Sequence, residues 1–349
     1  MSWYSVIYVY VRNVREKRPL LGLVLHLLLN SLLIIQLVLF WYCAYVYGFV
    51  LCGKMLRSGV QVSFYLFIWC SLTLMMMWSL IQTLRTPVSQ VPDIYFVDEE
   101  IDKRLKDCTP NANGRYMPDV SNVNQVEEQI KILVKVVEQK GLLLVETDHF
   151  GRIRYCYQCS LIKPDRAHHC SSCGFCVIKY DHHCPWINKC VSFGNYKFFL
   201  LYLFYGCCVV AWTLVTSIEG VIRYFVNQDW SGEAGYFAQI VISLVMCGVF
   251  GYYPLGELLI YHFGLVSLNE TTCEQAKIPI IRGDYRADYN FGRPFNFRAV
   301  FGWGLWLFPV DTAVIDGLHF PVHYSQTALA ADKICVRPVD KSDKLADQE

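Results

Sequence analysis

The sequence has few charged side chains. Asp, Glu, Lys and Arg make up 17% of its 349 residues, whereas a soluble domain carries roughly 25%. Apolar residues reach 54%, which excludes a disordered chain and argues against an ordinary soluble enzyme. The two signs of charge almost cancel, at a net charge of +1. The basic excess typical of nucleic-acid-binding proteins is therefore missing, and nucleic acid is not expected as a partner.

Four long segments contain no charged residue, at positions 20–53, 58–84, 198–218 and 234–256. Each is long enough for a helix of roughly 20 residues, which crosses a bilayer core of about 30 Å. Because a backbone in lipid must satisfy its hydrogen bonds internally, these segments are expected to be helical. The sequence therefore predicts four transmembrane helices, the first within 23–45 and the fourth extending toward Leu265.

Basic residues set the expected orientation. A cluster of them precedes the first span: Arg12, Arg15, Lys17 and Arg18. Such clusters stay in the cytosol, and an even number of spans returns the C-terminus to the same side. The large segment between spans two and three is then cytosolic as well, although Lys54 and Arg57 in the opposite loop conflict mildly with this orientation. Residues 3–11 are apolar and aromatic but too short to span, which predicts an interfacial anchor.

Cysteine, in contrast, is abundant, with 16 copies, many of them among histidines between positions 156 and 190. The ligand types repeat with a period of 14, as a Cys-x2-Cys pair, then a histidine, then a cysteine. Zinc prefers four tetrahedral thiolate and imidazole ligands. The repeat gives two interleaved sets: Cys156, Cys159, His169 and Cys176, and Cys170, Cys173, His183 and Cys190. A segment this short cannot bury a large core, and metal coordination can replace one.

Cys184 is left over by this scheme, because Ile187 stands where a third Cys-x2-Cys pair would need a cysteine. With His183 on metal, His182 is free beside the thiol, and Asp181 is close enough to orient it. A free thiol has a pKa near 8.5, so an imidazole is needed to take its proton, and a carboxylate can fix the imidazole tautomer. The pattern favours a Cys-His-Asp nucleophile. Two alternatives stay open: a structural zinc ribbon with Cys184 as a spare thiol, and Cys184 as a ligand with another cysteine free.

The segment from Arg154 to Phe199, with Asp181-His182-His183-Cys184-Pro185-Trp186 inside it, closely resembles the DHHC cysteine-rich domain. That domain defines the DHHC-type protein S-acyltransferases (palmitoyltransferases), and four spans with the domain between the second and third are also similar to that family. After span four, Thr271, Thr272 and Glu274 match the family's TTxE motif, and Asn296 lies in a segment similar to its PaCCT motif. The Asp-Pro-Gly motif that many members carry after span two is replaced by Thr86-Pro87-Val88.

The resemblance implies a two-step reaction. Cys184 would attack the thioester of a long-chain acyl-CoA and become acylated, and the acyl group would then pass to a protein cysteine. His182 would act as general base with Asp181 orienting it, and two structural zinc ions would hold the domain together. Thr272 and Glu274 would dock the C-terminal segment against the zinc domain or the membrane. The residues of the structural motifs are Thr271, Thr272, Glu274 and Asn296.

Candidate contacts to the acyl donor flank this site. Basic residues that suit the phosphates of CoA are Lys163, Arg166 and Lys189, and candidates for contact with the rest of the donor are Trp186, Phe199 and Tyr202. An acyl chain gains about 0.8 kcal/mol per buried methylene, so it is expected between the helices while its thioester meets Cys184. For each candidate an ordinary alternative stays open, namely a solvated surface charge or plain helix packing.

The expected fold is an all-α polytopic membrane protein with a small cytosolic two-zinc cysteine-rich domain between transmembrane helices two and three. Its segments are a cytosolic N-terminus with the anchor (1–19), helices one and two (20–85), a linker with an amphipathic helix at 124–140 (86–151), the DHHC cysteine-rich domain (152–197), helices three and four (198–266), the TTxE and PaCCT-like segment (267–310) and a mostly disordered tail (311–349).

The expected partners are acyl-CoA, membrane-associated proteins with cytosolic cysteines and the lipid bilayer, and an accessory subunit is left open. Members of the resembling family occur mainly on Golgi membranes, so the Golgi is the expected location, with the endoplasmic reticulum and plasma membrane as alternatives. The competing function is a catalytically inactive, membrane-anchored zinc-domain adaptor that binds partners without turnover.

Overall fold

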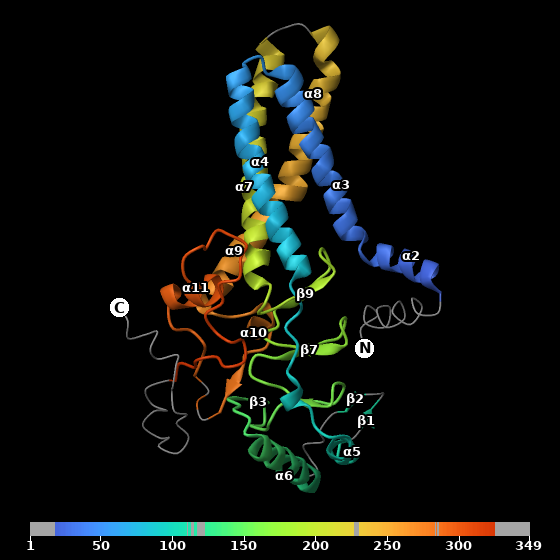
Figure 1. Ribbon diagram of the computed structural model, residues 1–349, viewed down its shortest axis with the longest axis vertical. Coiled ribbons are helices and arrows are strands. Elements are labelled where there is room, and N and C mark those ends of the chain that lie inside the picture. The colour runs from blue at the N-terminus through green and yellow to red at the C-terminus, as the bar shows by residue number, and fades with distance from the viewer. Residues whose placement is uncertain are drawn as a thin grey trace.

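The protein is long and narrow, with a helical bundle at one end and a smaller, irregular region at the other (Figure 1). The computed structural model describes residues 18–109, 111–112, 115–116, 123–226, 230–282, 284 and 286–324. The predicted anchor at 3–11, the basic residues Arg12, Arg15 and Lys17, and the tail beyond residue 324 lie outside the described residues.

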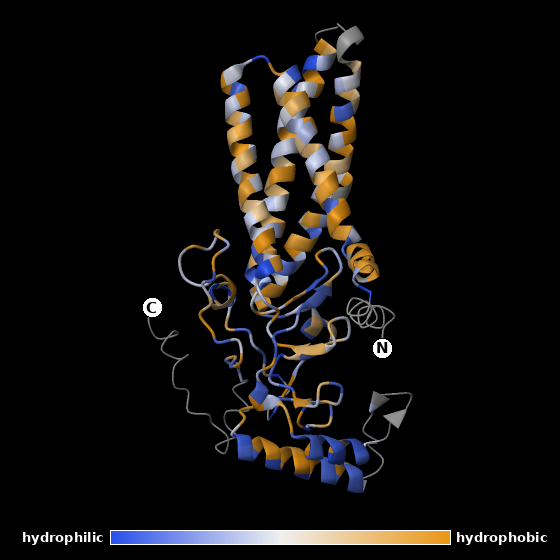
Figure 2. Cartoon of the chain, turned by 45° about the vertical axis from the view of Figure 1, so that its right-hand side comes forward, coloured by the Kyte–Doolittle hydropathy of each residue, from blue (hydrophilic) through white to orange (hydrophobic). Residues whose placement is uncertain are grey.

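Four helices in this part of the chain are long and apolar enough to cross a membrane: Ser31–Met55, Gly59–Arg85, Tyr196–Val226 and Ala234–Leu268. They make up the bundle, whose surface is rich in apolar residues (Figure 2). Phe67 and Ile260, for example, are 71% and 73% exposed. So much exposed apolar surface over helices of this length is suited to lipid rather than water. The predicted fold class is thereby confirmed, and the chain is a multi-pass membrane protein.

The first span begins and ends later than predicted. Residues 19–29 form a separate helix, α2 (Pro19–Leu29), which turns away from the bundle before α3 (Ser31–Tyr45) begins (Figure 1). Asn30 interrupts the helix with φ −95° and ψ 10°, and its side-chain oxygen accepts a 3.2 Å hydrogen bond from Asn188. The break is therefore held by the cysteine-rich region. The span continues through the π-helical segment η1 (Val46–Met55) instead of stopping at residue 45.

The third span is the most buried of the four and packs against the other three. It is α7 (Tyr196–Val226), and the second span is α4 (Gly59–Arg85). The fourth span consists of the end of α8 (Trp230–Val245), the π-helical η3 (Met246–Tyr252) and α9 (Tyr253–Leu268). Gly220 of α7 allows a close approach to the first span, since a Cβ there would lie 2.5 Å from Leu51 Cδ1.

The cysteine-rich region follows α4 and leads directly into α7, so it lies at one end of the bundle (Figure 1). Three short antiparallel hairpins carry it: β4 (Tyr155–Cys156) with β5 (Leu161–Ile162), β6 (His168–Cys170) with β7 (Phe175–Val177), and β8 (His182–Cys184) with β9 (Lys189–Val191). The linker before it contains η2 (Asp93–Tyr95), α5 (Glu99–Asp107), β1 (Asn111–Ala112), β2 (Arg115–Tyr116), the predicted amphipathic helix as α6 (Val123–Lys140), and β3 (Glu146–Thr147).

The C-terminal segment folds back onto the cysteine-rich region through α10 (Thr272–Ala276), β10 (Ile280–Ile281), which pairs with β3, and α11 (Arg293–Phe301). Residues 311–324 were expected to be mostly disordered, but they pack as well. Phe320 is buried, and Thr312 accepts a 2.7 Å hydrogen bond from Lys197. At Gly317, with φ 79°, a Cβ would collide with Phe193 at 2.6 Å. The ordered C-terminal segment therefore extends beyond residue 310.

Candidate active site

The eight residues predicted to bind zinc lie in two groups: Cys156, Cys159, His169 and Cys176, and Cys170, Cys173, His183 and Cys190. The three sulfur atoms lie 3.2–4.0 Å from His169 Nδ1 in the first group and 3.5–3.8 Å from His183 Nδ1 in the second. A tetrahedral zinc ion, with bonds of about 2.3 Å to sulfur and 2.0–2.1 Å to nitrogen, separates its ligand atoms by roughly 3.6 Å. Both donor sets therefore fit zinc, and Cys184 belongs to neither.

Hairpin registers bring the ligands together. His169 pairs with Cys176 across β6 and β7, and His183 pairs with Cys190 across β8 and β9. Cys170 follows His169 directly in β6 but belongs to the second group. Each group therefore joins two hairpins, and a metal in either one would fix how the hairpins stack.

The strand β8 also carries the predicted nucleophile and base. His182 Nδ1 lies 2.7 Å from Asp181 Oδ2, and both Asp181 and Cys184 are buried. Burial acts to lower the pKa of His182, but its hydrogen bonds to Asp181 and Cys184 prevail and raise it to about 9. Burial likewise opposes ionisation of Asp181, yet the bond to His182 keeps the carboxyl pKa below its ordinary value. A carboxylate, imidazole and thiol in this order can carry a proton away from the sulfur.

Thr272 secures the carboxylate from the C-terminal segment. Its backbone N–H donates to Asp181 Oδ1 at 3.1 Å, and its hydroxyl lies 2.9 Å from Oδ2 and 2.6 Å from the Asp181 carbonyl oxygen. Thr272 begins α10, and Thr271 caps this helix, because its hydroxyl accepts from the Glu274 backbone at 3.1 Å. The cap therefore aims the Thr272 N–H at the site, as expected from helix N-terminal geometry.

The position of the Arg166 side chain contradicts the prediction that it contacts the phosphates of CoA. It is fully buried, and its guanidinium forms a two-pronged ion pair with Glu274, with Nε–Oε1 at 2.7 Å and a second nitrogen 2.6 Å from Oε2. The same guanidinium donates to the Asn269 carbonyl at 2.6 Å and lies 4.3 Å from the ring centre of Tyr289. Arg166 is thus used inside the protein, so it is not available to the phosphates of CoA.

Asn296 is buried at the junction between α9 and α11. Its amide nitrogen donates to the Ser267 carbonyl at 2.8 Å and to Asn290 Oδ1 at 2.7 Å. Its amide oxygen accepts from the Phe291 N–H at 3.2 Å. The side chain therefore ties the C-terminal segment to the end of the fourth span and does not reach the β8 site.

The remaining candidates for contact with the acyl donor divide by position. Phe199 is buried, with its ring 5.6 Å from that of His182, and Tyr202 packs in the same apolar cluster as Cys184. Trp186 is 53% exposed. The ammonium group of Lys189 donates hydrogen bonds to the carbonyls of Leu84 and Thr86, at the end of α4. These bonds engage the charge that was predicted to contact a phosphate.

Lys163 is the remaining basic candidate, and it lies near His168. Burial, together with the positive charges of Arg154 and then Lys163, lowers the pKa of His168 to about 3. Lys163 itself is half-buried. Among the three predicted basic residues, it best suits a phosphate.

His262 of α9 was missed by sequence reasoning. It is fully buried, and one of its ring nitrogens lies within 4.8 Å of both a carboxylate oxygen of Asp181 and a ring nitrogen of His182. Its Nδ1 is 3.0 Å from the Tyr196 hydroxyl. A histidine within a membrane-spanning helix is itself a signal of function, but only the folded chain reveals which residues it contacts.

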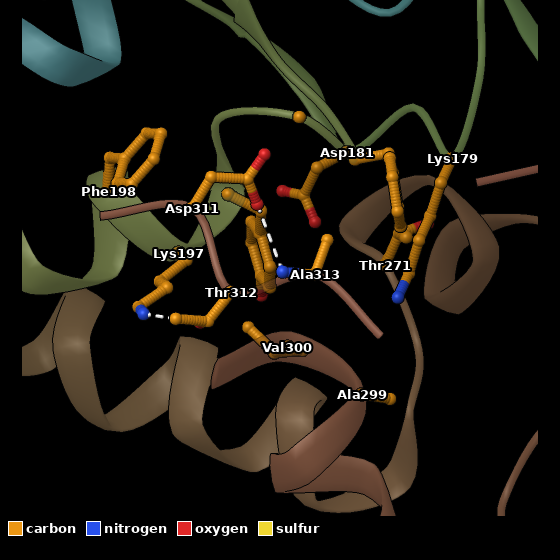
Figure 3. A pocket seen from close by; sticks show the side chains of 13 residues that line it. Lys179, Asp181, Lys197, Phe198, Thr271, Ala299, Val300, Asp311, Thr312 and Ala313 are labelled. Atoms are coloured by element: carbon orange, nitrogen blue, oxygen red, sulfur yellow. Dashed lines mark hydrogen bonds between the residues drawn. The ribbon is translucent and has the colours of Figure 1, made fainter. Parts of the chain in front are cut away.

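A cavity opens on another side of Asp181. Its lining includes Lys179, Thr271, Lys197 and Thr312, and Figure 3 shows the Asp181 carboxylate directed into it. Burial lowers the pKa of Lys179 to about 7. The cavity therefore lies between the cysteine-rich region, the start of α7 and the C-terminal segment, next to the carboxylate that contacts His182, and both polar and apolar side chains line it.

Cys184, His182 and Asp181 lie on a cysteine-histidine scaffold at the end of four membrane-spanning helices. This is the arrangement predicted from the resemblance to membrane-bound S-acyltransferases. The family model for the DHHC palmitoyltransferase matches residues 149–279. The chain is 50% identical to the palmitoyltransferase spe-10 of Caenorhabditis elegans over 327 residues, which are 94% of this chain and 93% of that protein. It is 32% identical to the palmitoyltransferase ZDHHC2 of Danio rerio over 293 residues (83% and 75%).

The human palmitoyltransferase ZDHHC20 is 34% identical over 264 residues, which are 74% of this chain and 65% of that protein. The chain belongs to the DHHC palmitoyltransferase family. The resemblance inferred from the cysteine-rich motif is thereby confirmed across most of the sequence.

Proposed function

We propose that the protein transfers a long-chain acyl group, in the first place palmitoyl, from acyl-CoA to cysteine thiols of membrane-associated proteins. The observation that carries the proposal is the 2.7 Å contact between Asp181 and His182, with Cys184 on the same short strand. The names of the relatives, all palmitoyltransferases, point to the same chemistry.

In the first step, His182 holds the proton of the Cys184 thiol, and the thiolate attacks the thioester carbonyl of acyl-CoA. A bond forms between Cys184 Sγ and the acyl carbon, the bond from that carbon to the CoA sulfur breaks, and the CoA thiolate takes the proton from His182. Asp181 fixes the orientation of the imidazole and stabilises its protonated form. The product is an acyl thioester on Cys184 and free CoA.

In the second step, a cysteine thiol of the protein substrate replaces CoA. His182 takes its proton, the substrate sulfur attacks the Cys184 thioester, and the returning proton restores the Cys184 thiol. One site thus serves both half-reactions in turn, which predicts ping-pong kinetics.

The acyl chain is proposed to lie between the helices. Cys184 belongs to an apolar cluster with Met76 of α4 and with Phe199 and Tyr202 of α7, so the reactive sulfur adjoins the membrane-spanning bundle. Burial contributes about 0.8 kcal/mol per methylene. The CoA moiety would remain in water, with Lys163 as a contact for its phosphates.

The two cysteine-histidine groups are proposed to hold structural zinc ions. Each offers four protein ligands, which leaves no open position for substrate. The cysteine-rich region and both termini are proposed to be cytosolic, where acyl-CoA and substrate cysteines are found, and Golgi membranes are the proposed location.

Acyl labelling of the purified full-length protein in detergent with a palmitoyl-CoA analogue tests the proposal. We expect a hydroxylamine-sensitive label that is lost in Cys184→Ser and forms more slowly in His182→Ala, with two zinc ions per chain retained. Cys207→Ser, in α7, serves as the matched cysteine control. Absence of label on a wild-type protein that holds two zinc ions would refute the enzyme and favour the adaptor, and label that persists in Cys184→Ser would assign the nucleophile to another cysteine.

A further inference from the structure

His262 lies beside the Asp181–His182 pair with one of its two nitrogens unused. Nε2 is buried and, among the described residues, has no hydrogen-bond partner. A buried polar atom left in this state costs about 1–3 kcal/mol, which a phenyl ring of similar size would not. The unused nitrogen therefore points to a partner beyond the contacts described so far.

Tyr196 determines which nitrogen carries the proton. Its hydroxyl lies 3.0 Å from His262 Nδ1 and has no other hydrogen-bond partner in the described part of the chain. If the hydroxyl donates to Nδ1, its proton is satisfied and the ring proton must sit on Nε2. The reverse arrangement would leave a buried hydroxyl proton without an acceptor. The favoured tautomer therefore makes Nε2–H a donor.

The Asp181 carboxylate has at least one acceptor position left for such a donor. A carboxylate offers about four lone-pair sites, and two are used, by His182 Nδ1 and by the backbone N–H of Thr272. The single proton of the Thr272 hydroxyl is shared between the Asp181 backbone carbonyl at 2.6 Å and Oδ2 at 2.9 Å, so it uses at most a third. One ring nitrogen of His262 is already within 4.8 Å of Asp181. That separation suits a bridging water or a small closure, because active-site hydrogen bonds often tighten only when substrate binds.

The rings around His262 restrain it in this place. Its centre lies 5.8 Å from that of His182, at an interplanar angle of 33°, and 5.3 Å from Phe199, nearly edge-on at 80°. The imidazole therefore touches the general base on one side and an aromatic ring of α7 on another. A shift of His262 would be transmitted to His182 by packing as well as through Asp181.

We infer that His262 is a positioning residue for acyl transfer: with its tautomer fixed by Tyr196, it donates from Nε2 to the Asp181 carboxylate and thereby holds the Asp181–His182 pair in register with Cys184. The inference rests on the proposed function and deepens it. His262 itself forms no bond to the acyl group. It extends the site from the cysteine-rich region into the fourth span, which the zinc ligands do not reach.

Single-turnover autoacylation of the full-length protein in detergent, measured over a range of palmitoyl-CoA analogue concentrations, tests this role. His262→Phe keeps the ring and removes both nitrogens. It is expected to lower the maximal rate about 10- to 100-fold, as for loss of a hydrogen bond to a charged group, without changing the half-saturating concentration or the zinc content. His262→Gln returns an N–H donor and is expected to recover most of the rate. Tyr261→Phe, the neighbouring position on α9, is the matched control.

The Tyr196 hydroxyl provides an independent readout. Tyr196→Phe is expected to slow acylation, and the double variant with His262→Phe is expected to be no slower than His262→Phe alone, because the two groups act as a unit. A His262→Phe rate within twofold of the control, or a His262→Gln rate as low as that of His262→Phe, would overturn the inference. If His262→Phe loses zinc, its rate is not informative, and Tyr196→Phe becomes the test. A wild-type acylation rate in Tyr196→Phe would then overturn the inference. A wild-type protein that takes no label would refute the proposed function itself.

Discussion

The buried ion pair between Arg166 and Glu274 gives the sharpest test of how the C-terminal segment is held. The exposed fractions of the two side chains are 0% and 2%, so neither charge is solvated when its partner is lost. Removing one member of such a pair typically costs about 3–5 kcal/mol, because the other charge stays buried and uncompensated. Glu274→Gln is the suitable change, since glutamine can also accept the hydrogen bond that closes the cap of α10.

We expect Glu274→Gln to lower the melting midpoint of the detergent-solubilised protein by about 6 °C or more. Differential scanning fluorimetry measures the midpoint, and the zinc content shows whether the cysteine-rich region survives. Glu128→Gln is the matched control, because it removes an exposed ion pair with Arg104, at 3.1 Å with 57% and 43% of the side chains exposed. Such a pair contributes at most about 1 kcal/mol.

The double variant Arg166→Met/Glu274→Gln separates charge from shape. It removes the uncompensated charge, so it is expected to melt above Glu274→Gln. If Glu274→Gln melts together with Glu128→Gln, the buried pair does not hold the segment and the reasoning is refuted. If the double variant melts below the single one, the hydrogen bonds of Arg166 to Asn269, and not its charge, are the dominant contribution.

Two further predictions concern the contacts that the C-terminal segment makes through Thr272 and Glu274. Thr272→Val removes the hydroxyl that lies 2.9 Å from Asp181 Oδ2 but keeps the backbone N–H, so single-turnover acylation is expected to slow about tenfold, and a rate equal to that of Ser71→Ala on α4 would contradict this. Burial opposes ionisation of Glu274, but Arg166 prevails and lowers its pKa. The stability from this carboxylate is then complete above its ordinary pKa, near 4.3, and is lost as pH falls through the lower folded value. Midpoints of the wild type and Glu274→Gln should therefore differ by a constant amount at neutral pH and converge only below a pH of about 4. A difference that does not shrink as the pH falls below that value would exclude this linkage.

The sequence was informative where function depends on local spacing. Segments without charged residues, each long enough to cross a bilayer as a helix, predicted the four spans. The 14-residue repeat predicted both groups of zinc ligands, because each hairpin pairs residues that are close along the chain. The predictions that failed depend on contacts between residues far apart in the sequence and on a local break in a helix. Nothing near Arg166 shows that Glu274, 108 residues later, will bury it. Likewise, Asn30 looks like one polar residue in an apolar run until Asn188 bonds to it from 158 residues away.

The Thr272–Asp181 hydrogen bonds also impose an order in time. Thr272 is made 91 residues after Asp181, so a ribosome has finished the whole cysteine-rich region, and must still deliver two membrane helices, before the carboxylate receives these donors. A nascent chain, or one that ends before Thr272, therefore carries the Cys184 thiol and its proposed base, His182, without the hydrogen bonds from Thr272 to Asp181. We therefore expect the chain to reach full competence for acylation only after both of these membrane helices and the start of α10 have been made.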